Sequence, residues 1–242
     1  MSSFKPLRTA RVLLNRCRGE AVVDGIRLPI DRAILSPNME RTLAKGRYEW
    51  GEARLGARVI SPGNTVLELG AGIGYVSSYI RCNTGAGKIV CVEANPALVP
   101  YIANVHRINR IAEATVLNGI VQSAPGDSLI PFYCRRDFWE SSLTAESGPY
   151  THIVDVPSLR FADVLEEHKP NVLIMDIEGG ELPLLLGLKQ MSHVRAIVAE
   201  IHENVYGEGG LGQLIAAVAR LGFVEDASGA ARAVRTWVRT SH

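Results

Sequence analysis

The sequence predicts an α/β fold, in which a mostly parallel sheet carries helices on both faces and a small accessory region precedes it. Three observations support this prediction. An apolar segment at 65–69 leads directly into a glycine-rich turn, apolar strands and helical segments then alternate along the chain, and Ser228-Gly229 separates two final strands. Such alternation is typical of parallel strands joined by helices, whereas the final turn predicts a hairpin whose last strand is antiparallel.

The accessory region is expected to comprise residues 1–60, with one hairpin and a few helices. Two short apolar runs flank Asp24-Gly25, a dipeptide typical of hairpin turns. Ser36 followed by Pro37 has the pattern of a helix N-cap with proline in the first turn. We therefore expect a helix to begin there and a second helix to follow it.

The main domain is expected to span residues 61–242. Strands are predicted at 65–69, 88–93, 114–121, 171–178, 195–203, 222–226 and 231–239, and helices at 74–82, 96–109, 158–168, 181–190 and 210–221. Residues 122–157 break the alternation with Pro, Gly, Ser and aromatic residues, which predicts an insertion over the carboxyl ends of the strands. Loops at that edge hold substrates in open α/β sheets, so we expect substrate specificity there and in the accessory region.

Four aromatic residues of this insertion have two interpretations that stay open. They either line a pocket for the acceptor or fix the insertion to the sheet. The four are Tyr133, Phe138, Trp139 and Tyr150.

Composition excludes several classes of protein. The 26 Lys and Arg nearly balance the 25 Asp and Glu, which argues against a nucleic-acid-binding surface. The basic segment at 5–18 is interpreted as a solvated helix face. The four cysteines are scattered without a Cys-x-x-Cys pair, so we expect neither a zinc site nor disulfides, and a cytoplasmic location. Neither a signal-peptide pattern nor a bilayer-spanning apolar run is apparent, so no membrane insertion is expected. The sequence is compatible with a homo-oligomer.

The glycine-rich turn carries most of the functional information. It contains Gly70, Gly72 and Gly74, whereas the dinucleotide fingerprint needs its third glycine where this chain has Tyr75. A pyrophosphate is therefore not the expected ligand. Glu68, two residues before the first glycine, would repel a diphosphate but pair with a cationic amino-acid end of a ligand.

A second acid follows about twenty residues later, as in βαβ units that bind a ribose. Glu93 ends the next apolar strand and can accept hydrogen bonds from both ribose hydroxyls. Together, these features describe a site for a nucleoside that carries a positive centre and an amino acid. S-adenosylmethionine has this composition.

Acidic residues and a histidine end two later strands that should reach the same edge of the sheet. Asp176 and Glu178 end one strand, and Glu200 and His202 end the next. Methyl transfer to a hydroxyl requires a group that removes the hydroxyl proton, and Asp176 and His202 are the candidates. A divalent cation held by Asp176, Glu178 and Glu200 is the less favoured alternative, since hard cations prefer oxygen ligands.

From about residue 48 to residue 204, the chain resembles the FkbM family of S-adenosylmethionine-dependent methyltransferases. The resemblance rests above all on the combination of LELGAGIGYVS, VEANP, MDIEGGE and AEIHEN. It implies a seven-stranded, Rossmann-like class I methyltransferase sheet and O-methylation of a small-molecule or sugar-containing acceptor. One departure is Met175, near which the family often carries a lysine.

The resemblance also implies the residues that contact the cofactor, with adenine near Gly119 and Ile120. The expected contacts are Glu68, Gly70, Ala71, Gly72, Gly74, Glu93, Ala94, Asn95, Gly119, Ile120 and Asp176. Two alternatives stay open: methylation of nitrogen on nucleic acid or protein, and a protein that binds an adenosine ligand without catalysis. NAD-dependent oxidoreduction ranks last because of Tyr75.

Overall fold

A computed structural model describes residues 5–124, 126–229 and 233–240. Its centre is a seven-stranded sheet with the order β11-β12-β10-β9-β3-β4-β5. The strands are β3 (Thr65–Leu69), β4 (Lys88–Glu93), β5 (Ala114–Asn118), β9 (Val172–Met175), β10 (Ala196–Glu200), β11 (Phe223–Glu225) and β12 (Val234–Arg239). Neighbouring strands from β10 to β5 are parallel, and β12 is antiparallel to both β10 and β11. The predicted fold class and the antiparallel last strand are confirmed.

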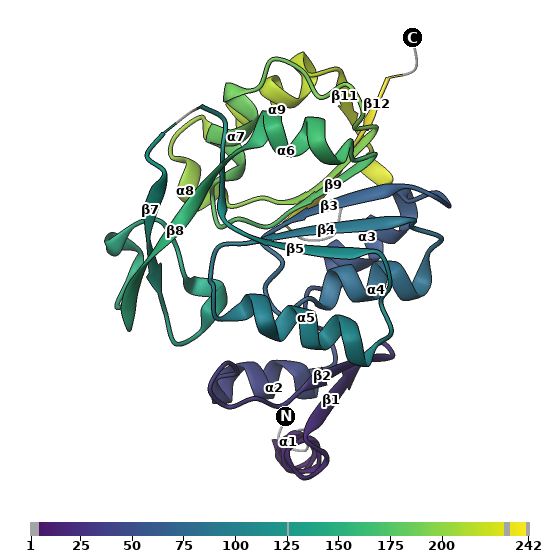
Figure 1. Ribbon diagram of the computed structural model, residues 1–242, viewed down its shortest axis with the longest axis vertical. Coiled ribbons are helices and arrows are strands. Elements are labelled where there is room, and N and C mark those ends of the chain that lie inside the picture. The colour runs from purple at the N-terminus through teal and green to yellow at the C-terminus, as the bar shows by residue number, and fades with distance from the viewer. Residues whose placement is uncertain (1–4, 125, 230–232, 241–242) are drawn as a thin grey trace.

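Helices cover both faces of this sheet (Figure 1). The helices α3 (Trp50–Val59), α4 (Tyr75–Asn83) and α5 (Leu98–Ile108) lie on one face, and α6 (Phe161–His168), α7 (Glu181–Gly187) and α9 (Gly210–Arg220) lie on the other. Successive residues of β3 point to opposite faces, so Val66 packs with the first group of helices and Leu67 with the second. Burial on both faces explains why the strand is a continuous apolar run except for one acid.

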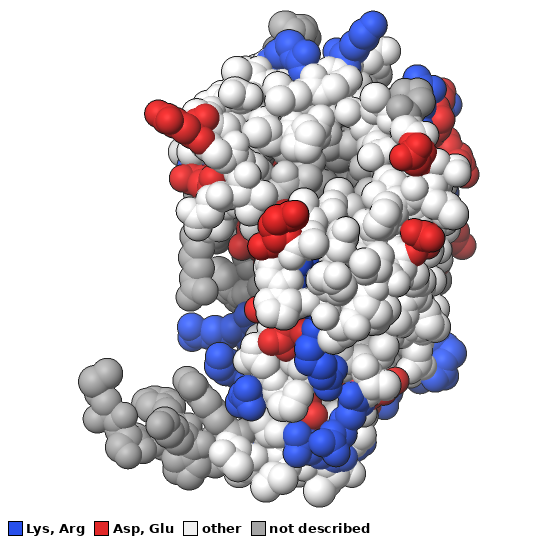
Figure 2. All heavy atoms as spheres, turned by 90° about the vertical axis from the view of Figure 1, so that its left-hand side faces the viewer, with Lys and Arg blue, Asp and Glu red and all other residues white. Residues whose placement is uncertain are grey.

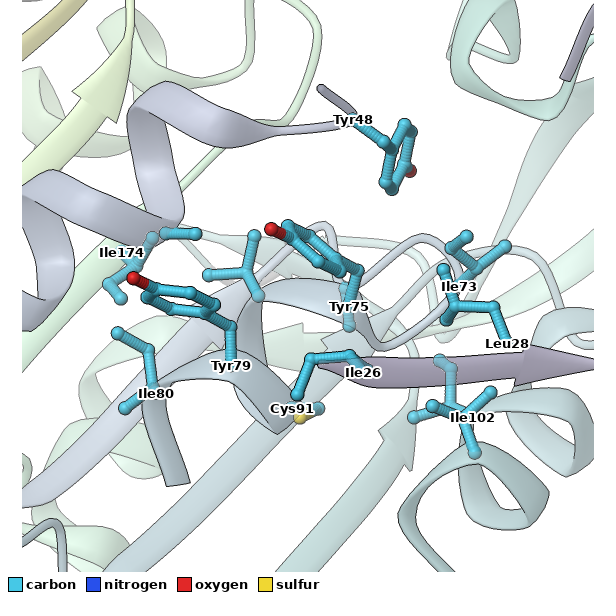
Figure 3. Close-up of a cluster of buried hydrophobic side chains, with 14 of the residues drawn as sticks. Ile26, Leu28, Tyr48, Ile73, Tyr75, Tyr79, Ile80, Cys91, Ile102 and Ile174 are labelled. Carbon is cyan, nitrogen blue, oxygen red and sulfur yellow. The ribbon is translucent and has the colours of Figure 1, made fainter. Parts of the chain in front are cut away.

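The N-terminal elements pack beneath α4 and α5. They are α1 (Lys5–Arg18), β1 (Glu20–Val23), β2 (Ile26–Pro29) and α2 (Pro37–Lys45). The predicted hairpin at Asp24-Gly25 is present, and the Ser36 hydroxyl caps α2 by accepting the Met39 N–H at 3.0 Å. Figure 3 shows Ile26 and Leu28 of β2 beside Ile102 of α5, in the same buried cluster as the underside of the sheet.

The insertion differs from the expected pattern. The strand predicted at 114–121 is divided, because β5 ends at Asn118 and the chain then turns at Gly119. Asn118 fixes this turn by donating to the carbonyl oxygens of Glu93 and Ala94, at 2.9 and 3.0 Å. The next strand, β6 (Ile120–Gln122), joins β7 (Leu129–Cys134) and β8 (His152–Arg160) in a separate three-stranded sheet. The helix expected from residue 158 therefore begins only at Phe161.

Other elements also end at different residues from those predicted. The strands expected at 171–178 and 195–203 end at Met175 and Glu200, and the short helix α8 (Glu203–Tyr206) follows the latter. The described residues also form three 3-10 helical turns: η1 (Phe138–Glu140), η2 (Ala145–Ser147) and η3 (Ala227–Gly229). The first residues of the strand expected from 231 lie outside the described part. None of the helices described here is long and apolar enough to span a bilayer.

Charge is unevenly distributed on the face drawn in Figure 2. Lys and Arg gather on its lower half, at the height of the N-terminal elements, with smaller groups at its top, whereas Asp and Glu are scattered over the whole face. Part of the basic character is neutralised within that region, since Arg16 pairs with the buried carboxylate of Glu40.

Candidate active site

The carboxyl ends of β3, β4 and β9 open into a cleft of about 840 Å³, including its mouth. Aromatic side chains of the insertion, Phe138 and Trp139, form part of its wall. The predicted cofactor residues that line the cleft are Gly70, Gly72, Glu93, Ala94, Gly119, Ile120 and Asp176. A cleft of this size, with apolar walls and a few polar groups, is typical of small-molecule sites.

The glycine turn forms one wall because its backbone approaches neighbouring strands closely. Gly70 has a φ of +81°, and a Cβ there would lie 1.8 Å from the carbonyl oxygen of Asp176. Gly72 also has a positive φ, of +53°. A side chain at residue 70 would therefore push the ends of β3 and β9 apart, and only glycine takes this backbone conformation without strain.

Glu93 lies at the floor of the cleft and is held by two backbone donors. Its Oε2 accepts the Gly72 N–H and its Oε1 accepts the Asn95 N–H, both at 2.8 Å. Burial raises the pKa of Glu93 to about 7, although these hydrogen bonds oppose the shift. A carboxylate oxygen can accept more than one hydrogen bond, so Glu93 keeps acceptor capacity for a ligand in the cleft.

Glu68 lies elsewhere. It is 3 % exposed and accepts a hydrogen bond from Cys91 Sγ at 3.2 Å, on the face of the sheet that α4 covers. Burial raises its pKa to about 7. Glu68 does not line the cleft, and the same holds for Ala71, Gly74 and Asn95, which act in the turn and in the caps around it. This position gives no support to the expected pairing of Glu68 with a ligand.

Asp176, Glu178, Glu181 and His202 meet at one edge of the cleft. The His202 Nε2 lies 3.5 Å from Asp176 Oδ1 and 3.4 Å from Glu178 Oε2. Its Nδ1 lies 3.5 Å from Oε1 of Glu181. The structure thus brings both predicted catalytic residues together.

Glu181 holds this cluster in place through several hydrogen bonds. It is fully buried and accepts hydrogen bonds from the backbone N–H groups of Ile177 and Gly179 and from the Tyr206 hydroxyl, at 2.8, 3.0 and 2.9 Å. Sequence reasoning did not select Glu181. Its place in the first turn of α7, directly after two glycines, is the signal that could have identified it.

The carboxyls of this cluster and His202 shift one another's pKa values. Burial raises the pKa of Asp176 well above its usual range, the charges of Glu200 and Glu178 add to this, and His202 opposes it. Burial alone would lower the pKa of His202, but its contact with Glu181 and the surrounding carboxylates raise that pKa to about 9. These carboxylates therefore favour the imidazolium form of His202.

A second cavity lies on the other side of Asp176, between α3 and β12. Its walls include Arg47, Glu49, Trp50, Glu52 and Glu200, and Glu49 lines the first cleft as well. Sequence reasoning did not select Glu49 or Glu52, because both belong to a helical segment far from the glycine turn in the sequence.

Among the residues that the structure describes, two groups of side chains have the spacing needed to hold a metal ion. They are Asp176 with Glu181 and His202, and Asp176 with Glu52 and Glu200, each with ligand atoms within 4.8 Å of one another. A proton shared between Glu52 and Glu200 also explains why the carboxyls of the second group lie so close together. Burial, with the charge of Glu200, raises the pKa of Glu52 to about 7.

Comparison with known proteins places most of the chain in one sequence family. The model of the methyltransferase FkbM domain matches residues 68–225. A search of curated proteins gave no match.

Solved structures with related folds are distant in sequence. Trm5b from Pyrococcus abyssi has 15% identity and a TM-score of 0.48, covering 90% of this chain and 54% of its own. This chain thus spans about half the length of Trm5b. A TehB-like SAM-dependent methyltransferase from Corynebacterium glutamicum has 15% identity and a TM-score of 0.48, with 84% and 95% coverage. The precorrin-6y C5,15-methyltransferase from Geobacter metallireducens has 13% identity and a TM-score of 0.47, with 79% and 88% coverage.

Proposed function

The chain belongs to the FkbM methyltransferase family, and from this premise we propose that it methylates a hydroxyl group of a small-molecule or sugar-containing acceptor. Its cofactor is S-adenosylmethionine, as the family requires. When bound, S-adenosylmethionine supplies an electrophilic methyl group whose departure leaves a neutral thioether.

The cleft fits this cofactor in three respects. Gly70 lets the turn lie against the carbonyl of Asp176, and a side chain at residue 72 would crowd Glu49 and Phe138, which line the cleft. Glu93 offers acceptor capacity for ribose hydroxyls at the floor of the cleft. Phe138 and Ile120 supply apolar surface for a base. We propose that the residues lining this cleft bind the cofactor.

Asp176 is the residue that most favours a hydroxyl group as the methyl acceptor. Its Oδ1 is buried and has no hydrogen-bond partner among the described residues. It lies at the edge of the cofactor cleft and within 4.8 Å of carboxylate oxygens in the second cavity. A carboxylate in this place, with a raised pKa, is suited to take a proton from an acceptor hydroxyl.

We assign the two predicted catalytic residues different roles. Asp176 would receive the proton that the acceptor hydroxyl loses when S-adenosylmethionine supplies its methyl group. The raised pKa of His202 favours its imidazolium form, which suits it to stabilise and orient the charge of Asp176 rather than to act as the base. Alignment of the acceptor with the methyl group supplies much of the remaining rate.

The proposal is tested with labelled S-adenosylmethionine and matched acceptors that carry either a hydroxyl or an amine on the same sugar or polyol. We expect label in the hydroxyl series, and a roughly 100-fold or greater loss of kcat in Asp176→Asn. Asp163→Asn is the matched control, because Asp163 is an exposed partner of Arg160 on α6. Preferred methylation of the amines, or unchanged turnover in Asp176→Asn, would contradict the proposal.

A further inference from the structure

Two neighbouring residues of the N-terminal region face the glycine turn from the side opposite to Glu93. A Cβ placed on Gly72 would lie 3.1 Å from the Tyr48 hydroxyl and 3.4 Å from Glu49 Oε1. The N–H of the same Gly72 is bonded to Glu93. Gly72 therefore separates the carboxylate proposed to bind the ribose from a hydroxyl and a second carboxylate.

The Tyr48 hydroxyl is a buried polar group beside the Glu49 carboxyl. Tyr48 is 6% exposed, and its hydroxyl meets this carboxyl without a well-formed hydrogen bond to any described residue. The ring is fixed by an edge-on contact with Tyr75, with centroids 5.8 Å apart, and Figure 3 shows Tyr48 above Tyr75, the first residue of α4. A buried hydroxyl of this kind is costly unless a ligand completes its hydrogen bond.

Glu49 is held toward the cleft by an unusual backbone conformation. It precedes α3 with φ 41° and ψ 40°, a left-handed conformation that is uncommon for residues other than glycine. Strained residues of this kind concentrate at ligand sites. Its side chain lines the cleft. Burial, with the neighbouring carboxyls of Glu52 and Asp176, raises the pKa of Glu49, so a cation bound there would stabilise its charged form.

We propose that Tyr48 and Glu49 bind the amino-acid end of S-adenosylmethionine. The Tyr48 hydroxyl donates to the carboxylate of the cofactor, and the Glu49 carboxylate accepts from its ammonium group. One donor and one anionic acceptor side by side match a zwitterion. This role was expected of Glu68, which is buried beneath α4 instead. The proposal concerns the cofactor alone and is independent of the acceptor.

The test compares two ligands that differ only at the proposed contact. S-adenosylhomocysteine carries the amino-acid end, whereas 5′-methylthioadenosine lacks it. Affinities of both are measured by calorimetry for the wild-type chain and for Tyr48→Phe, Glu49→Gln and Glu68→Gln. Each of the first two variants should bind S-adenosylhomocysteine roughly tenfold or more weakly, the range for one hydrogen bond to a charged group. Their affinity for 5′-methylthioadenosine should stay within about twofold of wild type.

The remaining variants separate this role from a structural one. Glu68→Gln should leave both affinities unchanged, and Glu93→Gln should weaken both ligands because each carries the ribose. Equal weakening of the two ligands in Tyr48→Phe and Glu49→Gln would overturn the proposal, since it would indicate a damaged cleft. Unchanged binding of S-adenosylhomocysteine in these variants, or its selective loss in Glu68→Gln, would overturn it as well.

Discussion

The buried carboxyl of Glu68 lowers the stability of the folded chain when it is ionised. Burial raises its pKa from 4.5 to about 7, so the folded state binds this proton more tightly than the unfolded state does. Between these two values the folded state loses stability as the pH rises, and above pH 7 the full penalty applies.

Replacing Glu68 with glutamine should remove this penalty. We expect Glu68→Gln to unfold at higher urea concentration than wild type at pH 8, with a gain of roughly 2–4 kcal/mol in the free energy of unfolding. The gain should nearly vanish at pH 4.5. Glu166→Gln is the control, because the side chain of Glu166 is 76% exposed. A variant less stable than wild type at pH 8 would show that the charged carboxylate is stabilised in the fold.

Glu68 and Glu93 show how far single residues could be predicted from the sequence. Both were expected at the cofactor, because each acid ends an apolar strand of the same βαβ unit. Glu93 is the last residue of its strand and lines the cleft, whereas Glu68 lies one residue before the end of β3 and points beneath α4. Side chains alternate along a strand, so one position decides which face an acid reaches, and the sequence does not reveal where a strand ends to that accuracy.

At the level of elements, the turn η1 joins the insertion to the N-terminal region. Asp137 accepts hydrogen bonds from the Ser36 hydroxyl and from the Asn38 side-chain amide. The next two residues, Phe138 and Trp139, form part of the wall of the cleft. The N-terminal region therefore holds that wall in place through Asp137.

Loss of the hydrogen bonds of Asp137 should make the wall of the cleft at Phe138 and Trp139 more mobile. We expect Asp137→Ala to speed proteolytic cleavage within the insertion and to raise the Kd for S-adenosylhomocysteine several-fold, since each lost contact is worth about 1 kcal/mol. Asp127→Ala is the matched control, because Asp127 is an exposed acid of the same insertion away from the cleft. Identical cleavage rates in the two variants would argue against this role of Asp137.

Most elements were predicted from periodicity and caps, but the strands within the insertion were not. The sheet strands, the first hairpin and the cap at Ser36 followed from local signals. The strand β8 was missed because Pro157 interrupts its pattern, and β6 was merged with β5 because Gly119 alone marks their boundary. Both depend on pairing between distant strands, which a local pattern does not contain.

At the scale of the whole molecule, the N-terminal region shares its core with the main sheet. Leu28 and Met39 belong to the same buried cluster as Ile80 and Ile102. The Tyr101 hydroxyl also donates to the carbonyl oxygen of Pro29, at 2.6 Å. We propose that residues 1–60 form an accessory region that does not fold apart from residues 61–242.

A chain that lacks residues 1–60 should therefore fail to fold cooperatively, because the apolar undersides of α4 and α5 would face water. The measurement is thermal unfolding followed by near-UV circular dichroism, with dye binding to exposed apolar surface. Removal of residues 1–18 alone is the milder comparison, since α1 packs mainly on α2 and β1. A shortened chain without residues 1–60 that unfolds cooperatively and binds S-adenosylhomocysteine would refute this proposal.

The most direct test of the account is calorimetric titration of the wild-type chain with S-adenosylmethionine, S-adenosylhomocysteine and NAD. The turn at 70–74 and the position of Glu93 predict saturable binding of the first two at one site and no binding of NAD. Binding of NAD without binding of S-adenosylmethionine would contradict the assignment of the cleft and the mechanism that depends on it.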